Sequence, residues 1–505
     1  NHDAIDAGAK AIVEVPVPAE WADCEAEPLF QPVTGDRADL VDYVNNIQNY
    51  VNSQTGNTLP VSSLLPYADG HMPQGSAAYE KRGVAVDVPM WNPDNCIQCN
   101  FCSYVCPHAC IRPIAMTDEE VAAAPEGTKT LPMTGMPQYK FAMTTTVLDC
   151  TGCGSCVNVC PGKKGEKALT MASLESQMGE QEVYTYGQSL PIKEDIFDKF
   201  KETSVKGSQF KQPLLEFSGA CAGCGETPYA KLITQLFGER MYVANATGCT
   251  SIWAGSSPAT PYTVNKKGQG PAWCNSLFED NAEFGLGMFL GQNTIREQLK
   301  EKVVALGEAT DNADVKAAIA EYLDTYTIGA KNGAATEKLV AALEACGCDA
   351  GKEILEQKEF LSKKSQWIFG GDGWAYDIGY GGLDHGVASG GDVNVFEFAT
   401  GAYSNTGGQA SKATNTGAIA QFAAAGKEVK KKDLAAIAMS YGYIYVAQVS
   451  MGADYNQTVK AIAEAEAYPG PSLVIGYAPC INHGIKGGMK IAQSEEKKAV
   501  TSGYW

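Results

Sequence analysis

The sequence predicts two folded parts of different class: a small α+β domain and, after it, an α/β domain whose mainly parallel sheet carries helices on both faces. Three observations support this prediction. Two dense cysteine runs lie between residues 86 and 180, short apolar segments alternate with helical ones from residue 212 onward, and 505 residues are too many for a single core.

Four stretches follow one another along the chain, and the last contains an insert. Residues 1–85 begin with a helical segment and continue through Pro- and Asn-rich sequence, typical of a connecting region or the tail of a preceding domain. Residues 86–180 form the cysteine-rich domain, and the charged stretch 181–211 predicts a linker or a surface helix. The α/β domain covers 212–505, with a helical insert at 294–365 outside the sheet.

The α/β prediction rests on short segments rich in apolar and β-branched residues, separated by helical sequence. A regular alternation of strand, loop and helix favours a parallel sheet, since parallel neighbours need a crossover connection. The expected strands cover residues 241–246, 366–369, 393–398, 443–449 and 472–477.

Composition and charge argue against several classes of function. The formal net charge of −19 disfavours a sequence-independent nucleic-acid binder, which needs a basic face to displace counterions. No run of about 18 apolar residues predicts a membrane span. The first residues, from Asn1, lack the basic and apolar regions of a signal peptide. We expect a cytoplasmic protein with no membrane or nucleic-acid partner.

Most of the 17 cysteines fall in tight arrays, which bind metal in a reduced, anaerobic setting rather than forming disulfides. Two runs share the spacing Cys-x2-Cys-x2-Cys-x3-Cys-Pro, in which three thiolates hold one cubane and the fourth ligates the other. Structural zinc is the alternative, but a tetrahedral site does not need three evenly spaced cysteines followed by proline. We predict a ferredoxin-like domain with one [4Fe-4S] cluster on Cys96, Cys99, Cys102 and Cys160 and another on Cys150, Cys153, Cys156 and Cys106.

Further cysteines are scattered over the α/β domain. Cys221 and Cys224 form a CxxC pair, which alone also fits a thioredoxin-like dithiol. Cys249 and Cys480 each follow an expected strand, so both should emerge at the sheet edge where loops collect ligands. Four thiolates could close around a third cubane, and spacing alone leaves both interpretations open. The remaining cysteines are interpreted as small buried or partly buried thiols: Cys24, Cys110, Cys274, Cys346 and Cys348.

A glycine-rich turn after the strand at 366–369 predicts a diphosphate site. Glycines on both sides of Asp372 let the backbone approach phosphate, and the Asp372 carboxylate suits Mg²⁺. With oxygen ligands after the next strand, this is the arrangement of the thiamine diphosphate motif; a turn without cofactor is the alternative. Asp392 and Asn394 could bind a structural cation such as Ca²⁺, or simply start a solvated strand. The expected diphosphate and Mg²⁺ residues are Gly371, Asp372, Gly373, Thr400, Ala402 and Asn405.

From about residue 55 to the end, these motifs, taken in order, resemble the pyruvate:ferredoxin (flavodoxin) oxidoreductase family. The resemblance implies oxidative decarboxylation of pyruvate with coenzyme A to acetyl-CoA and CO₂, with reduction of ferredoxin or flavodoxin. It also implies that Asn405 lies near the substrate and that a third cluster lies near the thiamine ring, on Cys221, Cys224, Cys249 and Cys480. The segments that carry the resemblance include DNCIQCNFCSYVCPH, LDCTGCGSCVNVCPG, FSGACAGCGETPYAK, ANATGCTSIW, GDGWAYDIGYGG, YSNTGGQASKAT and APCINHG.

The sequence also departs from the family. Before YSNT the family usually has an acidic residue, Thr and Glu-Val, whereas this chain has Ala399, Thr400, Gly401 and Ala402. The half that supplies the activating glutamate, the substrate-binding arginine and the coenzyme A domain has no counterpart here. We expect a fragment or one chain of a split enzyme, which needs the missing amino-terminal half and forms a homodimer.

Two other functions are alternatives to this one. One is a related oxidoreductase for another 2-oxoacid, since specificity residues lie mainly in the missing half. The other is a polyferredoxin electron carrier with a degenerate α/β domain. For docking of an acidic ferredoxin we expect a basic patch of Lys163, Lys164 and Lys167, with an ordinary solvated lysine run as the alternative.

Overall fold

The computed structural model describes residues 2–24, 28–255 and 258–505. The chain divides into two compact units, Asn1–Asp69 and Gly70–Trp505. Residues 70–85, which the sequence grouped with the preceding stretch, belong to the larger unit, because Ala77 packs into the core of the cysteine-rich domain.

The smaller unit is helical in its ordered elements. The exposed helix α1 (His2–Lys10) corresponds to the helical segment expected near the start of the chain. Further on, α2 (Ala38–Tyr43), a π-helical turn (Val44–Gln48) and α3 (Asn49–Asn52) run on from one another and bury Leu40 and Tyr43.

The cysteine-rich domain is an α+β fold with two antiparallel sheets, as predicted. The helices α4 (Phe101–Tyr104) and α6 (Ser155–Val159) each lie within one cysteine run, and they pack against each other. The long segment between the runs adds α5 (Asp118–Ala122) and a three-stranded sheet. The strands are β1 (Asp87–Trp91) paired with β5 (Leu169–Ser173), and β4 (Lys140–Thr145) lying between β2 (Ile111–Met116) and β3 (Leu131–Pro132).

The stretch expected to be a linker, 181–211, is folded. It contains most of α7 (Gly179–Ser189) and all of α8 (Ile196–Lys199) and α9 (Val205–Ser208). Tyr184 and Ile196 are buried in the same core as the strands of the cysteine-rich domain, which explains why this charged sequence is not a free connection.

Six parallel strands form the sheet of the α/β domain, in the order β10-β11-β9-β8-β6-β7. The five strands expected from the sequence are all present. The edge strand β7 was not expected, because its sequence AWCNS is mostly polar or exposed and lacks the apolar run of a central strand. The bounds are β6 (Met241–Ala246), β7 (Ala272–Ser276), β8 (Ser365–Gly371), β9 (Asn394–Ala399), β10 (Tyr445–Val449) and β11 (Ser472–Tyr477).

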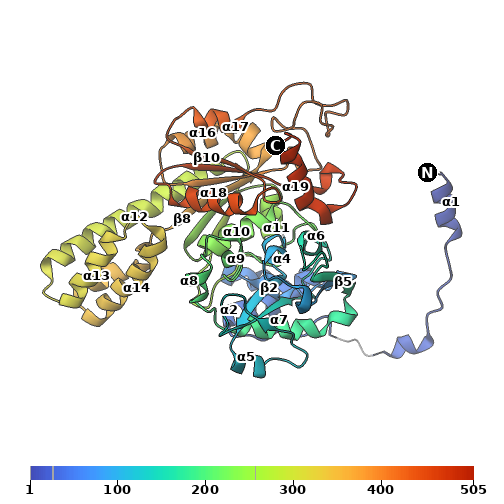
Figure 1. The fold of residues 1–505 in the computed structure, drawn as a ribbon, viewed down its shortest axis with the longest axis horizontal. Coiled ribbons are helices and arrows are strands. Elements are labelled where there is room, and N and C mark those ends of the chain that lie inside the picture. The colour runs from blue at the N-terminus through green and yellow to red at the C-terminus, as the bar shows by residue number, and fades with distance from the viewer. Residues whose placement is uncertain (1, 25–27, 256–257) are drawn as a thin grey trace. The chain divides into compact units, whose positions relative to one another are not determined.

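Helices cover both faces of this sheet, which confirms the predicted α/β class (Figure 1). Consecutive strand residues point to opposite faces, so Phe396 and Val395 contribute to separate apolar cores on the two faces. One face is covered by α10 (Thr227–Phe237), α11 (Cys249–Gly255) and α18 (Tyr455–Ala467), and the other by the start of α12 (Asn281–Ala309), α16 (Tyr380–Ala388) and α17 (Leu434–Met439).

The helical insert begins as a continuation of a sheet-covering helix. The first turns of α12 bury Ala282 and Leu286, and the helix then runs away from the sheet with α13 and α14 beside it (Figure 1). Its distal part shares an independent core with α13 (Ala313–Asp324), α14 (Gly329–Cys346) and α15 (Asp349–Leu355). The last helix of the chain is α19 (Ala492–Thr501). Within the described ranges, no helix has both the length and the apolar character needed to span a membrane.

Candidate cluster and cofactor sites

The first cysteine set surrounds a cavity beneath α4. Its surrounding apolar side chains include Trp91, Met143 and Leu169. Burial raises the pKa of the Cys102 thiol well above its ordinary value. Thiolates held here therefore need a cation or a cluster to compensate their charge. The sulfur ligands expected for the first cluster, all of which line this cavity, are Cys96, Cys99, Cys102 and Cys160.

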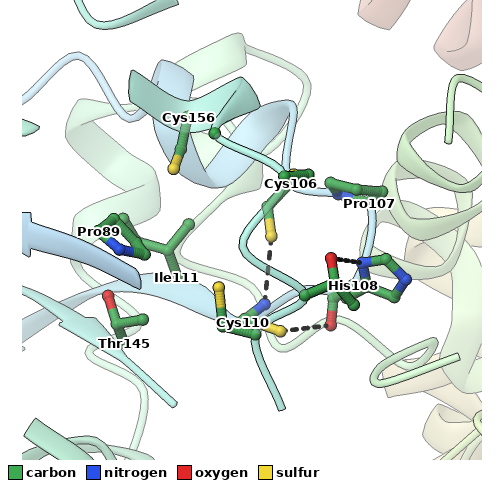
Figure 2. A pocket seen from close by; sticks show the side chains of 12 residues that line it. Pro89, Cys106, Pro107, His108, Cys110, Ile111, Thr145 and Cys156 are labelled. Atoms are coloured by element: carbon green, nitrogen blue, oxygen red, sulfur yellow. Dashed lines mark hydrogen bonds between the residues drawn. The ribbon is translucent and has the colours of Figure 1, made fainter. Parts of the chain in front are cut away.

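The second set lines a similar cavity beside the first residues of β2. Figure 2 shows the sulfur atoms of Cys106 and Cys156 pointing toward this space. Burial raises the pKa of Cys150 to about 12. The four expected ligands of the second cluster that line the cavity are Cys106, Cys150, Cys153 and Cys156.

Cys110 also lines the second cavity, and it contacts both carbonyl oxygens and the Cys106 side chain. Its thiol donates to the carbonyl oxygens of Asp149 (3.2 Å) and His108 (3.5 Å), as Figure 2 shows for His108. Its backbone N–H donates to Cys106 Sγ at 3.3 Å. Cys110 therefore fits a residue that supports a cluster ligand, in keeping with its interpretation as a buried thiol.

A repeated backbone turn orients the cysteines. The N–H of Gln98 donates to Cys96 Sγ, that of Gly152 to Cys150 Sγ, and that of Glu226 to Cys224 Sγ, each at 3.4 Å. The first two donors lie at positive φ (57° and 68°), which turns the N–H back toward the sulfur. Such N–H···S bonds stabilise negative charge on thiolates in iron–sulfur proteins.

The sulfur spacing does not suit a single metal ion. Among the described residues, no three Cys, His, Asp or Glu side chains gather closely enough to hold one ion. Tetrahedral zinc requires four sulfurs about 2.3 Å from one centre. Cysteines around an open cavity favour a polynuclear cluster over the zinc alternative.

The remaining ligand candidates lie where neighbouring parallel strands end. Cys480 follows β11, and Cys249 follows β6 and begins α11. Cys249 lies close enough to Cys224 and Cys480 to interact with both electrostatically, and Cys480 interacts with Cys221 in the same way. The structure therefore brings all four cysteines of the third expected cluster into one neighbourhood.

Gly225 explains how the CxxC turn reaches the Cys480 loop. Its N–H donates to the carbonyl of Pro479 at 3.1 Å. A Cβ at this position would lie 2.6 Å from the Pro479 backbone, a separation that real Cβ atoms do not adopt. Only glycine allows these two segments to approach so closely.

The diphosphate motif lies between these cysteine loops, because β9 and β8 separate β11 from β6 in the sheet. The buried Asp372, directly after β8, accepts hydrogen bonds on Oδ2 from Thr400 N (2.8 Å), Thr400 Oγ1 (2.8 Å) and Gly401 N (3.0 Å). Thr400 Oγ1 also lies 3.0 Å from the carbonyl oxygen of Ala402. Three of the expected Mg²⁺ ligands are thus neighbours.

The other carboxylate oxygen of Asp372 fits a metal ion. Asp372 Oδ1 is buried and has no hydrogen-bond partner among the described residues. Burial raises the Asp372 pKa, so the ionised carboxylate needs positive charge nearby, part of which Lys431 supplies. A hard divalent cation on Oδ1 meets this need and matches the neutral oxygens beside it.

The remaining residues of the motif frame this position. Gly373 packs so closely on Tyr403 that a Cβ would lie 2.2 Å from its ring. Gly371 ends β8, and Asn405 is exposed on the loop that follows Thr400. No hydrogen bond links Asn405 to Asp372 among the described residues.

Sequence reasoning missed two buried carboxyl groups beside the motif. Glu397 is fully buried in β9, and burial, then the charge of Asp372 and a side-chain hydrogen bond with Asp372, raise its pKa. Glu226 accepts from Trp253 Nε1 at 3.0 Å, and burial raises its pKa to about 7. An acidic residue inside the apolar strand VFEF, and GE directly after CAGC, were the available signals.

Residues expected to form a calcium site and a carrier-docking patch make other contacts in the structure. Asp392 forms an ion pair with Lys363 (2.8 Å), and Asn394 Nδ2 donates to Glu466 Oε2 (2.9 Å). Lys167 Nζ contacts the carbonyl oxygens of Val157 and Asn158 at the end of α6. Lys163 and Lys164 are exposed beside it.

The fold and these sites define a protein with a dicluster iron–sulfur domain joined to a thiamine diphosphate enzyme domain. Residues 95–164 match the family described as a 4Fe-4S dicluster domain. Residues 345–475 match the C-terminal TPP-binding domain of thiamine pyrophosphate enzymes, and residues 31–85 match EKR, a domain of unknown function.

Over its whole length, the chain is homologous to the carboxyl-terminal half of pyruvate-flavodoxin and pyruvate:ferredoxin oxidoreductases. It is 51% identical over 507 residues to pyruvate-flavodoxin oxidoreductase of Klebsiella pneumoniae, covering 100% of this chain and 42% of that protein. It is 51% identical over 515 residues to pyruvate:ferredoxin oxidoreductase of Moorella thermoacetica, covering 100% of this chain and 43% of that protein. Pyruvate dehydrogenase [NADP(+)] of Euglena gracilis is 46% identical over 497 residues, covering 97% of this chain and 27% of that protein. The chain spans less than half the length of these relatives.

Proposed function

We propose that this chain is the electron-transfer and diphosphate-binding half of a pyruvate:ferredoxin (flavodoxin) oxidoreductase. The reaction is oxidative decarboxylation of pyruvate with coenzyme A, giving acetyl-CoA, CO₂ and reduced carrier. One observation supports this most directly. Four adjacent strands, β11, β9, β8 and β6, are followed within three residues by Cys480, Thr400, Asp372 and Cys249 respectively. A cluster and a cofactor diphosphate would therefore lie side by side.

In this proposal, Asp372 Oδ1, Thr400 Oγ1 and the Ala402 carbonyl hold Mg²⁺ together with the diphosphate. Asn405 lies near the substrate, and the backbone at Gly371 and Gly373 lets the diphosphate approach. Bound thiamine diphosphate supplies the carbanion stabilisation that decarboxylation of a 2-oxoacid requires. The chain itself positions the diphosphate, neutralises its charge through Mg²⁺ and provides an exit for electrons.

Three [4Fe-4S] clusters form that exit. The cluster on Cys221, Cys224, Cys249 and Cys480 receives electrons first, and the two clusters of the ferredoxin-like domain pass them outward. Cys110 is not a ligand. Calcium has no part in the proposal, because Lys363 and Glu466 already contact Asp392 and Asn394.

The partners follow from the chemistry that this chain lacks. The amino-terminal half, or a separate subunit, supplies the remaining thiamine contacts, the substrate carboxylate contact and coenzyme A binding. The assembly is a homodimer, works in anaerobic cytoplasm and passes electrons to ferredoxin or flavodoxin. Lys163 and Lys164 remain candidates for carrier docking, whereas Lys167 binds the end of α6.

A decisive experiment combines composition with turnover. The anaerobically purified chain should contain about twelve irons and matching acid-labile sulfide, as three cubanes require. With the amino-terminal half it should reduce viologen or ferredoxin when given pyruvate, coenzyme A and Mg²⁺–thiamine diphosphate. Full iron content without any thiamine diphosphate binding would favour the polyferredoxin alternative. Turnover with a different 2-oxoacid, but not pyruvate, would favour the related enzyme.

A further inference from the structure

The loop that carries the diphosphate motif hydrogen bonds directly to a proposed cluster ligand. Ser404 Oγ lies 3.3 Å from Cys249 Sγ and is oriented to donate to it. Ser404 follows Thr400 and Ala402 on the same loop and directly precedes Asn405. A single hydroxyl group thus joins the proposed Mg²⁺–diphosphate loop to the proposed cluster.

The Ser404 backbone is held by the loop that carries Cys480. Asn482 Nδ2 donates to the carbonyl oxygen of Ser404 at 2.8 Å. Asn482 lies two residues after Cys480, which is another proposed ligand of the same cluster as Cys249. The Cys480 loop therefore fixes the Ser404 backbone. The side chain of Ser404 contacts one proposed ligand loop, and its backbone contacts another.

His483 forms a second bridge between the same two loops. Its Nδ1 accepts the N–H of Cys480 at 3.2 Å, which places the ring proton on Nε2. Nε2 then donates to the Thr400 carbonyl oxygen at 2.6 Å. The ring lies nearly parallel to that of Tyr477, with an interplanar angle of 9° and centroids 6.3 Å apart. The Cys480 loop and the diphosphate loop are therefore tied together at both Thr400 and Ser404.

We propose that Ser404 is a positioning residue that couples the potential of this cluster to occupancy of the diphosphate site. The inference rests on the proposed function, because it needs a cluster on Cys249 and a diphosphate on the Thr400 loop. A hydroxyl hydrogen bond to a ligating sulfur stabilises the more negative, reduced cluster and so raises its midpoint potential. Thr400 and Ala402, the proposed Mg²⁺ ligands, lie four and two residues before Ser404, so an occupied site acts on the backbone that carries this hydroxyl group.

The coupling is reciprocal. If the bound cofactor changes the midpoint potential, reduction of the cluster changes cofactor affinity by the same free energy. Through Ser404, the midpoint potential of the first electron acceptor thus depends on whether the neighbouring diphosphate site is filled.

The test is a redox titration of the full 505-residue chain, purified anaerobically and followed by electron paramagnetic resonance. The unchanged chain, Ser404→Ala, Ser404→Thr and Thr406→Ala are titrated with and without Mg²⁺–thiamine diphosphate. Thr406→Ala is the matched control, because Thr406 Oγ1 on the same loop donates to Gln409 rather than to a cysteine. Iron content and retained spectra of all three clusters verify that each variant is folded.

We expect Ser404→Ala to lower the midpoint potential of the third cluster alone and to abolish its shift on cofactor addition. Ser404→Thr, which keeps a hydroxyl group, should restore both properties, and Thr406→Ala should match the unchanged chain. An unchanged potential and cofactor shift in Ser404→Ala would overturn this inference while leaving the proposed function intact. Absence of the third cluster from the unchanged chain would instead overturn the proposed function and this inference together.

Discussion

The ammonium group of Lys231 donates a hydrogen bond to the carbonyl oxygen of Tyr104 at 3.0 Å, and also contacts the carbonyl oxygen of Ser103. Lys231 belongs to α10 of the α/β domain, whereas its acceptors end α4 of the ferredoxin-like domain. Its side chain is almost fully buried. A single positive charge therefore joins the two domains. It contacts the backbone between Cys102 and Cys106, which are proposed ligands of different clusters.

Replacement of Lys231 by Met should lower the midpoint potentials of both clusters in the ferredoxin-like domain. Burial lowers the Lys231 pKa to about 8, while the nearby sulfurs of Cys106 and Cys102 favour its charged form. Because reduction adds negative charge to a cluster, loss of a buried cation disfavours the reduced state. We expect a decrease on the order of 60 mV, or about 1.4 kcal/mol for a one-electron couple, measured by redox titration. Lys460→Met, on an exposed part of α18, is the control, and equal potentials in both variants would contradict the prediction.

Replacement of Cys106 and of Cys110 should have opposite outcomes although both line one cavity. Cys106→Ala should lose about four irons per chain, since a cubane needs all four thiolates. Cys110→Ala should retain them, because the Cys110 thiol donates to the carbonyl of Asp149, and its contacts with Cys106 are hydrogen bonds from its backbone N–H and its side chain. Iron and sulfide analysis of the two variants distinguishes them. Iron loss in Cys110→Ala at normal solubility would show that the fifth cysteine is a ligand.

Replacement of Asp372 by Asn should weaken Mg²⁺–thiamine diphosphate binding by at least about 100-fold, more than a supporting contact contributes. The amide can still accept on one oxygen from Thr400, but it loses the charge and the second oxygen offered to Mg²⁺. Titration of tryptophan fluorescence with cofactor measures the dissociation constant. Asp392→Asn is the control, since it removes an ion pair with Lys363 and not a proposed metal ligand. This variant should bind Mg²⁺–thiamine diphosphate normally. Equal affinities in the two variants would remove Asp372 from the metal site.

Sequence alone predicted the fold class and the proximity of the expected ligands because both depend on local patterns. The cysteine spacings correspond to cavities lined by the expected sets, and four of the predicted strands end at the motifs singled out. Parallel strands with helical crossovers leave their carboxyl ends at one edge. That rule predicted that Cys249 and Cys480 emerge at one edge of the sheet, and the family resemblance added a position near the thiamine site.

The residues that connect these motifs could not be predicted in the same way. Ser404 reaches Cys249 across 155 positions, and Lys231 reaches Tyr104 across 127. Such contacts depend on the packing of one domain or loop against another, which leaves no periodicity in the sequence. The buried Glu397 could not be predicted either, because a lone acidic residue in a strand has no fixed spacing to a partner.

Glu496 in α19 is another buried carboxyl group whose surroundings only the structure shows. Its Oε2 accepts from Gly452 N at 2.6 Å and lies 3.4 Å from both Tyr229 OH and Ser450 Oγ. Its Oε1 faces the Gln493 amide, whose own oxygen has no partner among the described residues. A protonated Glu496 could donate to that oxygen after a flip of the Gln493 amide. The hydrogen bonds that Glu496 accepts lower its pKa, but burial raises it by more.

Glu496 should make the protein less stable as pH rises from about 4.5 to about 8. Burial raises its pKa to about 8 in the folded chain, whereas the unfolded value is near 4.5. In this window the folded state holds more protons than the unfolded state, so the free energy of unfolding falls with pH, by at most about 1.4 kcal/mol per unit. Glu496→Gln stays neutral and keeps an oxygen acceptor for Gly452 N–H. The stability of Glu496→Gln relative to the unchanged chain should therefore increase between pH 5.5 and 8, measured by anaerobic denaturant titration. A stability difference that stays constant across this range would mean that Glu496 is ionised in the folded protein throughout.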